Sequence, residues 1–305
     1  MMLIGIDHGN KQVKTVHGKP FVSGLQQSVT KPFGKDVLKY QDTYYTLSDQ
    51  RIPYRKDKTE DNRFFVLTLF ALAGELAARA CNTEEVILVK LAVGLPPAHF
   101  GAQTKRFTEY FKNHGIIEFS FNGKAFTVYI EDVACFPQAY AAAATMLYQL
   151  MDDTKAVILD IGGLTADYLL LKNGQADLST CDSLENGVLL LYNHIRSKAN
   201  AELDILLDEN DVDIILQGKG ESYPDTAVRL VEEGAQQFIN DLFSTLRERM
   251  LDLRFMKVIF VGGGAILLRR QIETSGKVGN PLFVNDINAN AKGYEYLYQI
   301  EMTGR

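Results

Sequence analysis

Residues 156–167 read AVILDIGGLTAD, a short apolar run followed by a glycine-rich turn between two aspartates. Short β-branched runs that end at glycine are typical of buried strands. The alternating residues 166–171 predict a second strand, and Asn173-Gly174 predicts a further hairpin turn. The stretch therefore predicts a strand–turn–strand unit, which differs from the strand–turn–helix of Rossmann and P-loop units.

The same arrangement occurs near the start of the chain. There the run LIGI (residues 3–6) is followed by DHGN (residues 7–10) and then by alternating residues 12–16. A strand, a turn with aspartate and glycine, and a second strand thus occur twice, which predicts two related halves. A third apolar run, residues 258–261, leads into the glycines 262–264.

The length and composition are those of a globular protein with about two domains. The chain has 305 residues, of which 46% are hydrophobic and 23% charged. Its net charge of −6 argues against a broadly basic surface for nucleic acid. The three cysteines are far apart and odd in number, and no signal-peptide pattern opens the chain. We therefore expect a cytoplasmic protein without a disulfide framework or a His/Cys metal site.

Hydrophobic spacing predicts the elements between these turns. The apolar run Phe64–Ala73 is roughly half the length of a membrane helix, which favours a buried helix. Asn122-Gly123 predicts a hairpin within residues 119–130, and a strand is expected over Glu85–Leu95. Further helices are predicted over Arg63–Arg79, Thr104–Asn113, Phe136–Met151 (opened by Pro137), Gly187–Ala199, Pro224–Leu253 and Tyr294–Met302.

Both aspartate–glycine turns have chemistry suited to phosphate. Glycine lets backbone N–H groups approach an anion closely, and Lys14 is in phase to point back toward its turn. In the second turn, Thr165 adds a hydroxyl. Asp7 and Asp160 would flank one magnesium ion and a phosphate tail if the halves pack with their loops together. The alternative for the first turn is an ordinary solvated hairpin, because Asp and Gly are routine turn residues.

Other segments have plainer interpretations. The glycines 262–264 suit a platform for a base or ribose, or equally a tight strand–helix packing turn. His8 is interpreted as a cap of its loop. The aromatic face of Phe107, Tyr110 and Phe111 is interpreted as core. The acidic stretch Asp204–Asp213 is interpreted as a solvated face.

Taken together, these motifs resemble those of a known protein superfamily. The two phosphate loops, Pro137-Gln138-Ala139, the triple glycine and the segment NANAKG (residues 288–293) occur in the order of the actin-fold ATPase superfamily. That group includes actins, sugar kinases and the seventy-kilodalton heat-shock chaperones. The chain resembles most the ParM-type bacterial actin-like proteins that segregate plasmids. The resemblance implies an α/β, actin-like fold with two related, ribonuclease-H-like domains around a nucleotide cleft, over residues 1–150 and 151–305.

The resemblance also implies roles for single residues, with ATP or GTP and Mg²⁺ as ligands. Gln138 falls where family members place a Glu or Gln that orients the attacking water; ParM-type proteins often carry Glu, and Gln is a poor base. Its alternative is a polar residue at a helix start. Catalysis is assigned to Gln138, Asp160 and Asp7, and the metal to Asp7 and Asp160. Nucleotide binding is assigned to Gly9, Asn10, Lys11 and Lys14, to Gly162, Gly163, Leu164 and Thr165, to Glu185 and Gly187, and to Gly262, Gly263, Gly264 and Ala265.

Two classes of function follow from the resemblance. The first is an ATPase that assembles head to tail into filaments, with an adaptor protein bound to centromere-like DNA; the chain itself is then not expected to bind DNA or membrane. The second is a small-molecule kinase on the same fold, for which no extra substrate segment is evident. A non-enzymatic scaffold is a further alternative, and a chaperone would need a substrate-binding extension.

Overall fold

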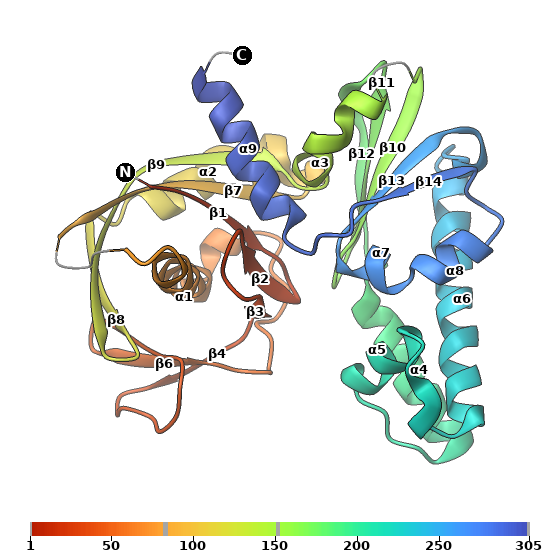
Figure 1. The fold of residues 1–305 in the computed structure, drawn as a ribbon, viewed down its shortest axis with the longest axis horizontal. Helices are drawn as coiled ribbons and strands as arrows, with labels where there is room; N and C mark the ends of the chain where they lie inside the picture. The colour runs from red at the N-terminus through yellow and green to blue at the C-terminus, as the bar shows by residue number, and fades with distance from the viewer. Residues whose placement is uncertain (1, 82–84, 151–152, 304–305) are drawn as a thin grey trace. The chain divides into compact units, whose positions relative to one another are not determined.

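The computed structural model describes residues 2–81, 85–150 and 153–303. The chain forms two compact units, each with its own mixed sheet (Figure 1). The first unit contains the residues up to Thr145 together with those from Ile287 onward, and the second contains Met146–Asp286.

The sheet of the first unit has the order β3-β2-β1-β7-β9-β8-β5-β6-β4. At its centre β1 pairs antiparallel with β2 and parallel with β7, which in turn pairs parallel with β9. The hairpin at Asn122-Gly123 joins β8 to β9, as predicted. The strands are β1 (Met2–His8), β2 (Gln12–Thr15), β3 (Phe21–Val22), β4 (Leu25–Ser28), β5 (Val37–Tyr40), β6 (Thr43–Leu47), β7 (Ile87–Leu95), β8 (Ile116–Phe121) and β9 (Lys124–Pro137).

The sheet of the second unit has the order β12-β11-β10-β13-β14. Its first strand β10 pairs antiparallel with β11 and parallel with β13, which pairs parallel with β14. This repeats the arrangement of β3-β2-β1-β7-β9, so the predicted internal repeat is confirmed. The strands are β10 (Lys155–Ile161), β11 (Ala166–Lys172), β12 (Gln175–Leu184), β13 (Lys257–Val261) and β14 (Asn280–Phe283).

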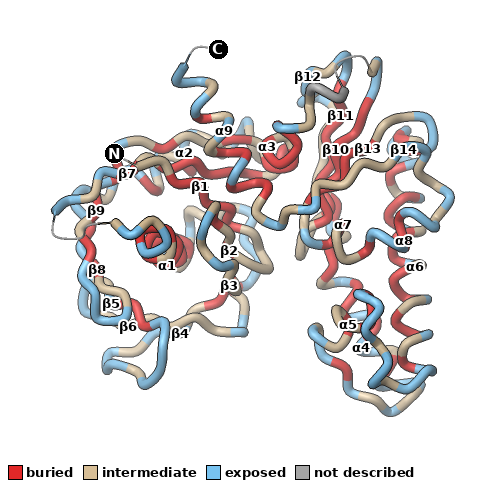
Figure 2. The backbone as a smooth tube through the Cα atoms, viewed as in Figure 1, coloured by how far each residue is buried: buried red, intermediate tan, exposed pale blue. Residues whose placement is uncertain are grey.

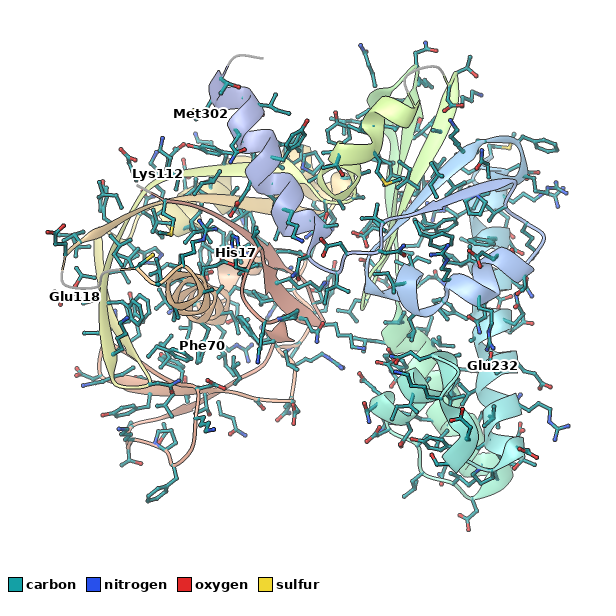
Figure 3. All side chains as sticks on the ribbon, in the orientation of Figure 1. His17, Phe70, Lys112, Glu118, Glu232 and Met302 are labelled. Atoms are coloured by element: carbon teal, nitrogen blue, oxygen red, sulfur yellow. The ribbon has the colours of Figure 1, made fainter. Side chains whose placement is uncertain are left out.

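The apolar run Phe64–Ala73 belongs to α1 (Arg63–Ala78) and is buried along its whole length. In Figure 1 the first sheet curves around α1, and Figure 3 shows Phe70 inside that curve. A helix that is apolar on all sides is stable only inside a core, which explains the run. Among the helices of the described ranges, none is long and apolar enough to cross a membrane.

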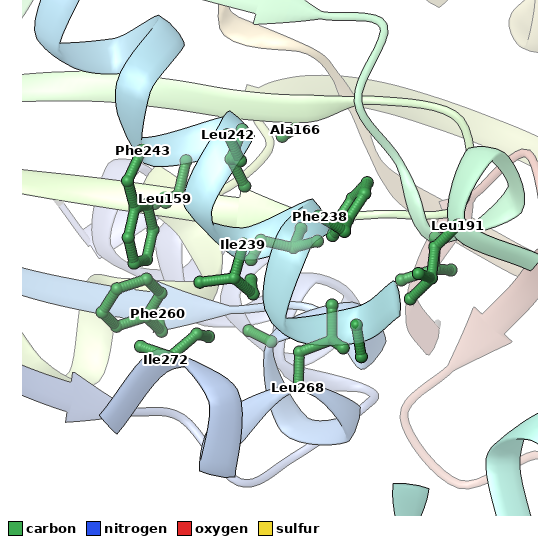
Figure 4. Packing of buried hydrophobic residues seen from close by; sticks show 14 of the residues in the cluster. Leu159, Ala166, Leu191, Phe238, Ile239, Leu242, Phe243, Phe260, Leu268 and Ile272 are labelled. Atoms are coloured by element: carbon green, nitrogen blue, oxygen red, sulfur yellow. The ribbon is translucent and has the colours of Figure 1, made fainter. Parts of the chain in front are cut away.

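The core of the second unit lies between its sheet and its helices. Figure 2 shows the buried residues of both in red. Figure 4 shows Phe238, Leu242 and Phe243 of α6 packed against Leu159 of β10 and Phe260 of β13. The helices are α4 (Val188–Leu203), α5 (Glu209–Leu216), α6 (Asp225–Glu248), α7 (Gly263–Leu267) and α8 (Arg269–Thr274).

The prediction of one α-helix over Phe136–Met151 is wrong at its start and in the type of helix. Strand β9 continues to Pro137, which pairs with Leu95 of β7, and α3 (Tyr140–Ala143) is followed by a 3₁₀ helix over Ala144–Leu150. Proline is tolerated at the end of a strand because its missing N–H removes no further ladder bond. Met151 lies outside the described residues.

Three other predicted segments differ in extent. Helix α2 (Pro97–Lys112) begins seven residues before Thr104, with proline in its first turn. Helix α6 ends at Glu248 rather than Leu253, and α9 (Ala289–Thr303) begins before Tyr294. The acidic stretch Asp204–Asp213 overlaps the first half of α5, whose Val212 and Ile215 are buried in the core; only the other side of this helix is a solvated face.

The C-terminal helix α9 packs with the first unit, whereas residues 151–305 were expected to form one domain. Glycines allow this close packing. A Cβ at Gly5 of β1 would overlap the carbonyl oxygen of Ala291, and one at Gly293 would overlap that of Ala141 in α3. Backbone therefore meets backbone where α9 crosses β1 and α3.

A buried carboxylate holds the connection between β2 and β3 against α1. Glu75 is fully buried and accepts the backbone N–H groups of His17 (2.5 Å) and Gly18 (2.9 Å). The Arg79 guanidinium lies 3.0 Å from its other oxygen. Burial alone would raise the pKa of Glu75, but the hydrogen bonds from His17, Thr15 and Gly18 outweigh it and lower the pKa from 4.5 to about 2.

We expect this carboxylate to make stability pH-dependent. Because its folded pKa is depressed, its contribution is complete above pH 4.5 and is lost as the pH falls toward 2. At about 1.4 kcal/mol per pKa unit, the loss is about 3 kcal/mol. Urea unfolding of the wild type and of Glu75→Gln should differ at pH 7 and converge only as the pH falls to about 2. The exposed control Glu118→Gln should follow the wild type; a pH-independent gap for Glu75→Gln would contradict the assignment.

Candidate functional site

The first candidate loop connects β1 to β2. Asp7, only 4% exposed, lies near the end of β1 directly opposite Lys14 of β2, and 3.7 Å separates Oδ2 from the lysine Nζ. Cross-strand partners project from the same face of a sheet. A buried carboxylate and a partly buried ammonium therefore stand side by side next to the turn formed by Gly9, Asn10 and Lys11.

The carbonyl groups of this turn are fixed from one side. The Ser23 hydroxyl donates to the Gly9 oxygen at 2.5 Å, and the Ser23 N–H donates to the Lys11 oxygen at 3.2 Å. A Cβ at Gly9 would lie 2.6 Å from the Gln12 oxygen, so the turn requires glycine there. In a trans peptide the C=O and the following N–H point in opposite directions. The N–H groups of Asn10 and Gln12 therefore point away from Ser23.

Gln138 is distant from Asp7 in the sequence, but its side chain contacts the Asp7 carboxylate. It follows β9, is 8% exposed, and donates from Nε2 to Asp7 Oδ1 at 3.2 Å. The predicted catalytic residues Gln138 and Asp7 are thus in contact within the first unit. The interpretation of Gln138 as the polar start of a helix is wrong, since helix α3 begins only at Tyr140.

His8 lies on the other face of β1 and does not cap the loop. Its imidazole is buried, stacks on Phe111 with a centroid distance of 5.1 Å, and is hydrogen-bonded to Thr68 Oγ1 at 2.9 Å. Burial, and secondly the positive charge of Lys58, lower the pKa of His8 to about 3. His8 is therefore a neutral core residue, and the aromatic residues Phe107 and Phe111 belong to the core as predicted.

The second candidate loop, between β10 and β11, is held by the start of α4. The N–H groups of Gly187, Val188 and Leu189 donate to the carbonyl oxygens of Leu164, Gly162 and Gly163, at 3.0, 3.1 and 2.9 Å. These N–H groups belong to a helix start and would otherwise lack intrahelical partners. The helix thus orients three successive peptide planes of the loop.

Because the three carbonyl groups point toward α4, the N–H groups of the same three peptides point away from it. The peptides after residues 162, 163 and 164 are trans, so the N–H groups of Gly163, Leu164 and Thr165 point away from α4. Within the described part of the chain, none of the three has a backbone acceptor. Successive N–H groups that point to one side form a concave site suited to an anion.

Two buried carboxylates lie beside this loop. Asp160 (7% exposed) and Asp167 (4% exposed) are cross-strand partners on β10 and β11. Asp167 accepts hydrogen bonds from Thr165 Oγ1 (3.1 Å) and from the Ser183 hydroxyl. Like charges that are directly opposite repel one another, so the pair favours a nearby cation. Asp167 orients the Thr165 hydroxyl, a role that the sequence motif alone did not assign.

Each loop has beside it a carboxylate of the kind that magnesium prefers. Mg²⁺ in proteins is typically bound by one or two carboxylates, with phosphate oxygens and water completing its shell. Asp7 and Asp160, one in each unit, are hard oxygen donors of this type, and each lies next to its unit's loop. In the described residues no group of three or more His, Cys, Asp or Glu side chains forms a metal cage.

The triple glycine after β13 has a structural function at two of its positions. Gly262 has a φ of 89°, and a Cβ there would overlap the Asp160 carboxylate. A Cβ at Gly264 would lie 2.6 Å from the Ile161 oxygen, whereas Gly263 faces open space. Two of the glycines thus serve a tight strand–helix turn. Ala265 lies in the core, so that only its backbone can reach a ligand.

Two further residues assigned by resemblance lie between β12 and α4. Glu185 is exposed, and Gly187 is the N-cap of α4. A Cβ at Gly187 would overlap the carbonyl of Gly163. The structure thus places Gly187 against the second loop. Its N–H holds the loop by a hydrogen bond, and its lack of a side chain allows the loop to lie this close.

Three further residues of the site were not assigned from the sequence. The Ser23 and Ser183 hydroxyls and the Asn290 carboxamide bond to Gly9, Asp167 and the N–H of Ala139, and each of these three hydrogen bonds spans 14 or more residues. Single serines and asparagines are too common to be recognised without the fold. Asn290 alone could have been noticed, because it belongs to the NANAKG segment.

Two family models match the chain, one in each half. Residues 5–140 match the model for actin-like proteins, N-terminal domain, and residues 158–274 match the model for the archaeal actin homologue MreB-like, C-terminal. A comparison with curated proteins gives no match.

Solved structures of similar fold cover nearly the whole chain. The actin-like protein Alp7A has a TM-score of 0.78 at 15% identity, with 99% of this chain and 97% of Alp7A covered. Bacillus thuringiensis ParM with ATP has a TM-score of 0.73 at 13% identity, with 99% of both chains covered. The Alp12 filament structure has a TM-score of 0.68 at 15% identity, with 99% and 98% covered.

The chain accordingly has the actin-like fold, and each of its two parts matches a family model of actin-like or MreB-like proteins.

Proposed function

We propose that this protein is an actin-like nucleoside triphosphatase that assembles into nucleotide-dependent filaments. The observation that carries the proposal is the second loop, where α4 directs three successive N–H groups to one side beside the buried Asp160. A row of such donors suits phosphate oxygens. The first unit repeats the plan with Asp7, Lys14 and a glycine turn. The structure of a relative with ATP supports the choice of nucleotide.

Different residues have different roles in phosphate hydrolysis. The N–H groups of Gly163, Leu164 and Thr165, with those of the first loop, bind phosphate oxygens, and Lys14 neutralises charge on them. Asp7 and Asp160 would hold Mg²⁺, which supplies charge neutralisation to the phosphates when bound. Gln138 orients the attacking water through its carboxamide, while its Nε2 stays on Asp7. Gln138 acts by orientation because an amide is a poor base.

The adenosine part of the nucleotide would contact the second unit. Gly263 is the member of the triple glycine with open space beside it, so a flat base or ribose can approach it. Glu185 is exposed and could accept a ribose hydroxyl. Gly262 and Gly264 would act indirectly, by placing α7 against β10.

Filament assembly rests on the similarity to actin-like relatives, one of which is solved as a filament. Head-to-tail contacts use two different surfaces of each copy and so extend without closing. Following the resemblance to ParM-type proteins, we propose plasmid or DNA segregation as the purpose. An adaptor protein bound to centromere-like DNA would then contact the filament, which agrees with the chain's net charge of −6.

Sedimentation tests this proposal directly. With ATP and Mg²⁺ the wild type is expected to appear in the high-speed pellet and to scatter light, and both signals should decline as ATP is consumed. A non-hydrolysable ATP analogue should prolong the signal, and omission of nucleotide should abolish it. Phosphate release is measured in the same samples. A monodisperse monomer under all salt and protein concentrations would contradict filament assembly, and absent phosphate release would contradict the hydrolase.

A further inference from the structure

The segment NANAKG (residues 288–293) has no part in the proposed nucleotide contacts, yet it reaches the Gln138 region. Asn290, in the first turn of α9, is 8% exposed. Its Oδ1 accepts the backbone N–H of Ala139 at 3.0 Å. A buried asparagine therefore bonds to the residue that follows Gln138.

Ala139 has an unusual backbone conformation. Its φ is 63° and its ψ is −58°, and the N–H of Tyr140 donates to the Gln138 oxygen at 2.6 Å. These angles and this hydrogen bond define a γ-turn with positive φ at its central residue, which is a rare and strained form. Such conformations persist only where the surroundings impose them, and they concentrate at functional sites.

The turn decides where Gln138 points. On its N-terminal side the Gln138 N–H donates to the Leu95 oxygen at 2.8 Å, so β9 fixes the chain up to Gln138. Its side chain then reaches Asp7 Oδ1 at 3.2 Å. If Ala139 relaxed to negative φ, the peptide between Gln138 and Ala139 would rotate. The direction of the Gln138 side chain would then no longer be fixed.

Helix α9 is a rigid support for Asn290. It meets β1 and α3 through backbone contacts at Gly5 and Gly293, where no Cβ fits. Glu295 accepts the Gly5 N–H at 2.9 Å and lies 3.0 Å from the Arg79 guanidinium. Because α9 contacts both β1 and α3, Asn290 is fixed relative to Asp7 as well as to Ala139.

We propose that Asn290 is a positioning residue for hydrolysis: its carboxamide holds the strained turn at Ala139 and thereby keeps Gln138 on Asp7. The proposal rests on the proposed function, in which Gln138 orients the attacking water. It assigns the NANAKG segment a role in the hydrolytic step, separate from nucleotide binding.

The test combines hydrolysis kinetics with nucleotide affinity. Asn290→Ala is expected to lower kcat for ATP hydrolysis about tenfold, because small displacements of an orienting group slow the chemical step. The affinity for a fluorescent ATP analogue should stay within about twofold of wild type. Asn290→Asp retains an acceptor for the Ala139 N–H and should keep most of kcat. In the Asn290→Ala background, Ala139→Gly should restore part of kcat, since glycine adopts positive φ without strain.

A second readout does not depend on hydrolysis. Amide hydrogen exchange at Ala139 should be faster in Asn290→Ala than in wild type and unchanged in Gln299→Ala, an exposed control on the same helix. Unchanged kcat or unchanged exchange in Asn290→Ala would overturn the proposal. A parallel loss of affinity and kcat that Ala139→Gly does not restore would also overturn it, because it would indicate a general packing role. A wild type without hydrolysis would refute the proposed function, and the exchange rates would then still show whether Asn290 holds the turn.

Discussion

Asp160→Asn is expected to lower the rate of ATP hydrolysis by about 100-fold or more, since it removes a negative charge at the place where phosphate and magnesium would be bound. The side chain is 7% exposed at the end of β10 and contacts the turn at Gly262. Asparagine has the same shape, so the packing around Gly262 should survive. Repulsion from the opposite carboxylate of Asp167 should also decrease.

Three measurements distinguish this expectation from simple unfolding. Phosphate release should fall, the apparent affinity for Mg²⁺ in the presence of ATP should weaken, and the free energy of unfolding should stay equal or rise. Asp241→Asn, on the exposed side of α6, is the matched control and should resemble wild type in all three. Hydrolysis by Asp160→Asn at the wild-type rate would refute the proposed site.

The central strands could be predicted because their signals are local. An apolar run that ends in an aspartate–glycine turn defines β1 and β10, and the period of two places Lys14 on the same face as Asp7. The repeat of the motif predicted two related sheets, and β1 and β10 do have equivalent neighbours. The burial of Phe64–Ala73 in α1 could likewise be inferred from this uninterrupted apolar run.

The remaining features depend on contacts between distant residues. Strands β3 to β6 are two to five residues long and largely intermediate in burial, so they have no clear periodicity. The alanines after Gln138 favour a helix locally, but pairing of β9 with β7 extends the strand to Pro137. In the same way, no local pattern could indicate that Asn290 fixes the turn at Ala139. Tertiary contacts override local propensity at these positions.

Gly187→Ala is expected to weaken nucleotide binding about 100-fold through a single added methyl group. Gly187 has a φ of −89°, which alanine adopts readily, so backbone strain is not the reason. The reason is contact: the Cβ would overlap the backbone of Gly163 and Leu164, and backbone cannot rotate away as a side chain can. The loop must move, and its N–H groups then lose their common direction. Loss of two hydrogen bonds to a charged phosphate, at about 1.5 kcal/mol each, corresponds to roughly that factor.

The same substitution at a site with free space is the control for this prediction. Gly101 lies in α2, and a Cβ there would meet no atom within 4 Å. Gly101→Ala should bind the fluorescent ATP analogue as wild type does and gain up to about 1 kcal/mol in helix stability. For Gly187→Ala, circular dichroism should remain that of a folded protein while affinity falls and salt dependence weakens. Wild-type affinity in this variant would mean that the loop carbonyls held by α4 do not set the direction of the phosphate-binding N–H groups.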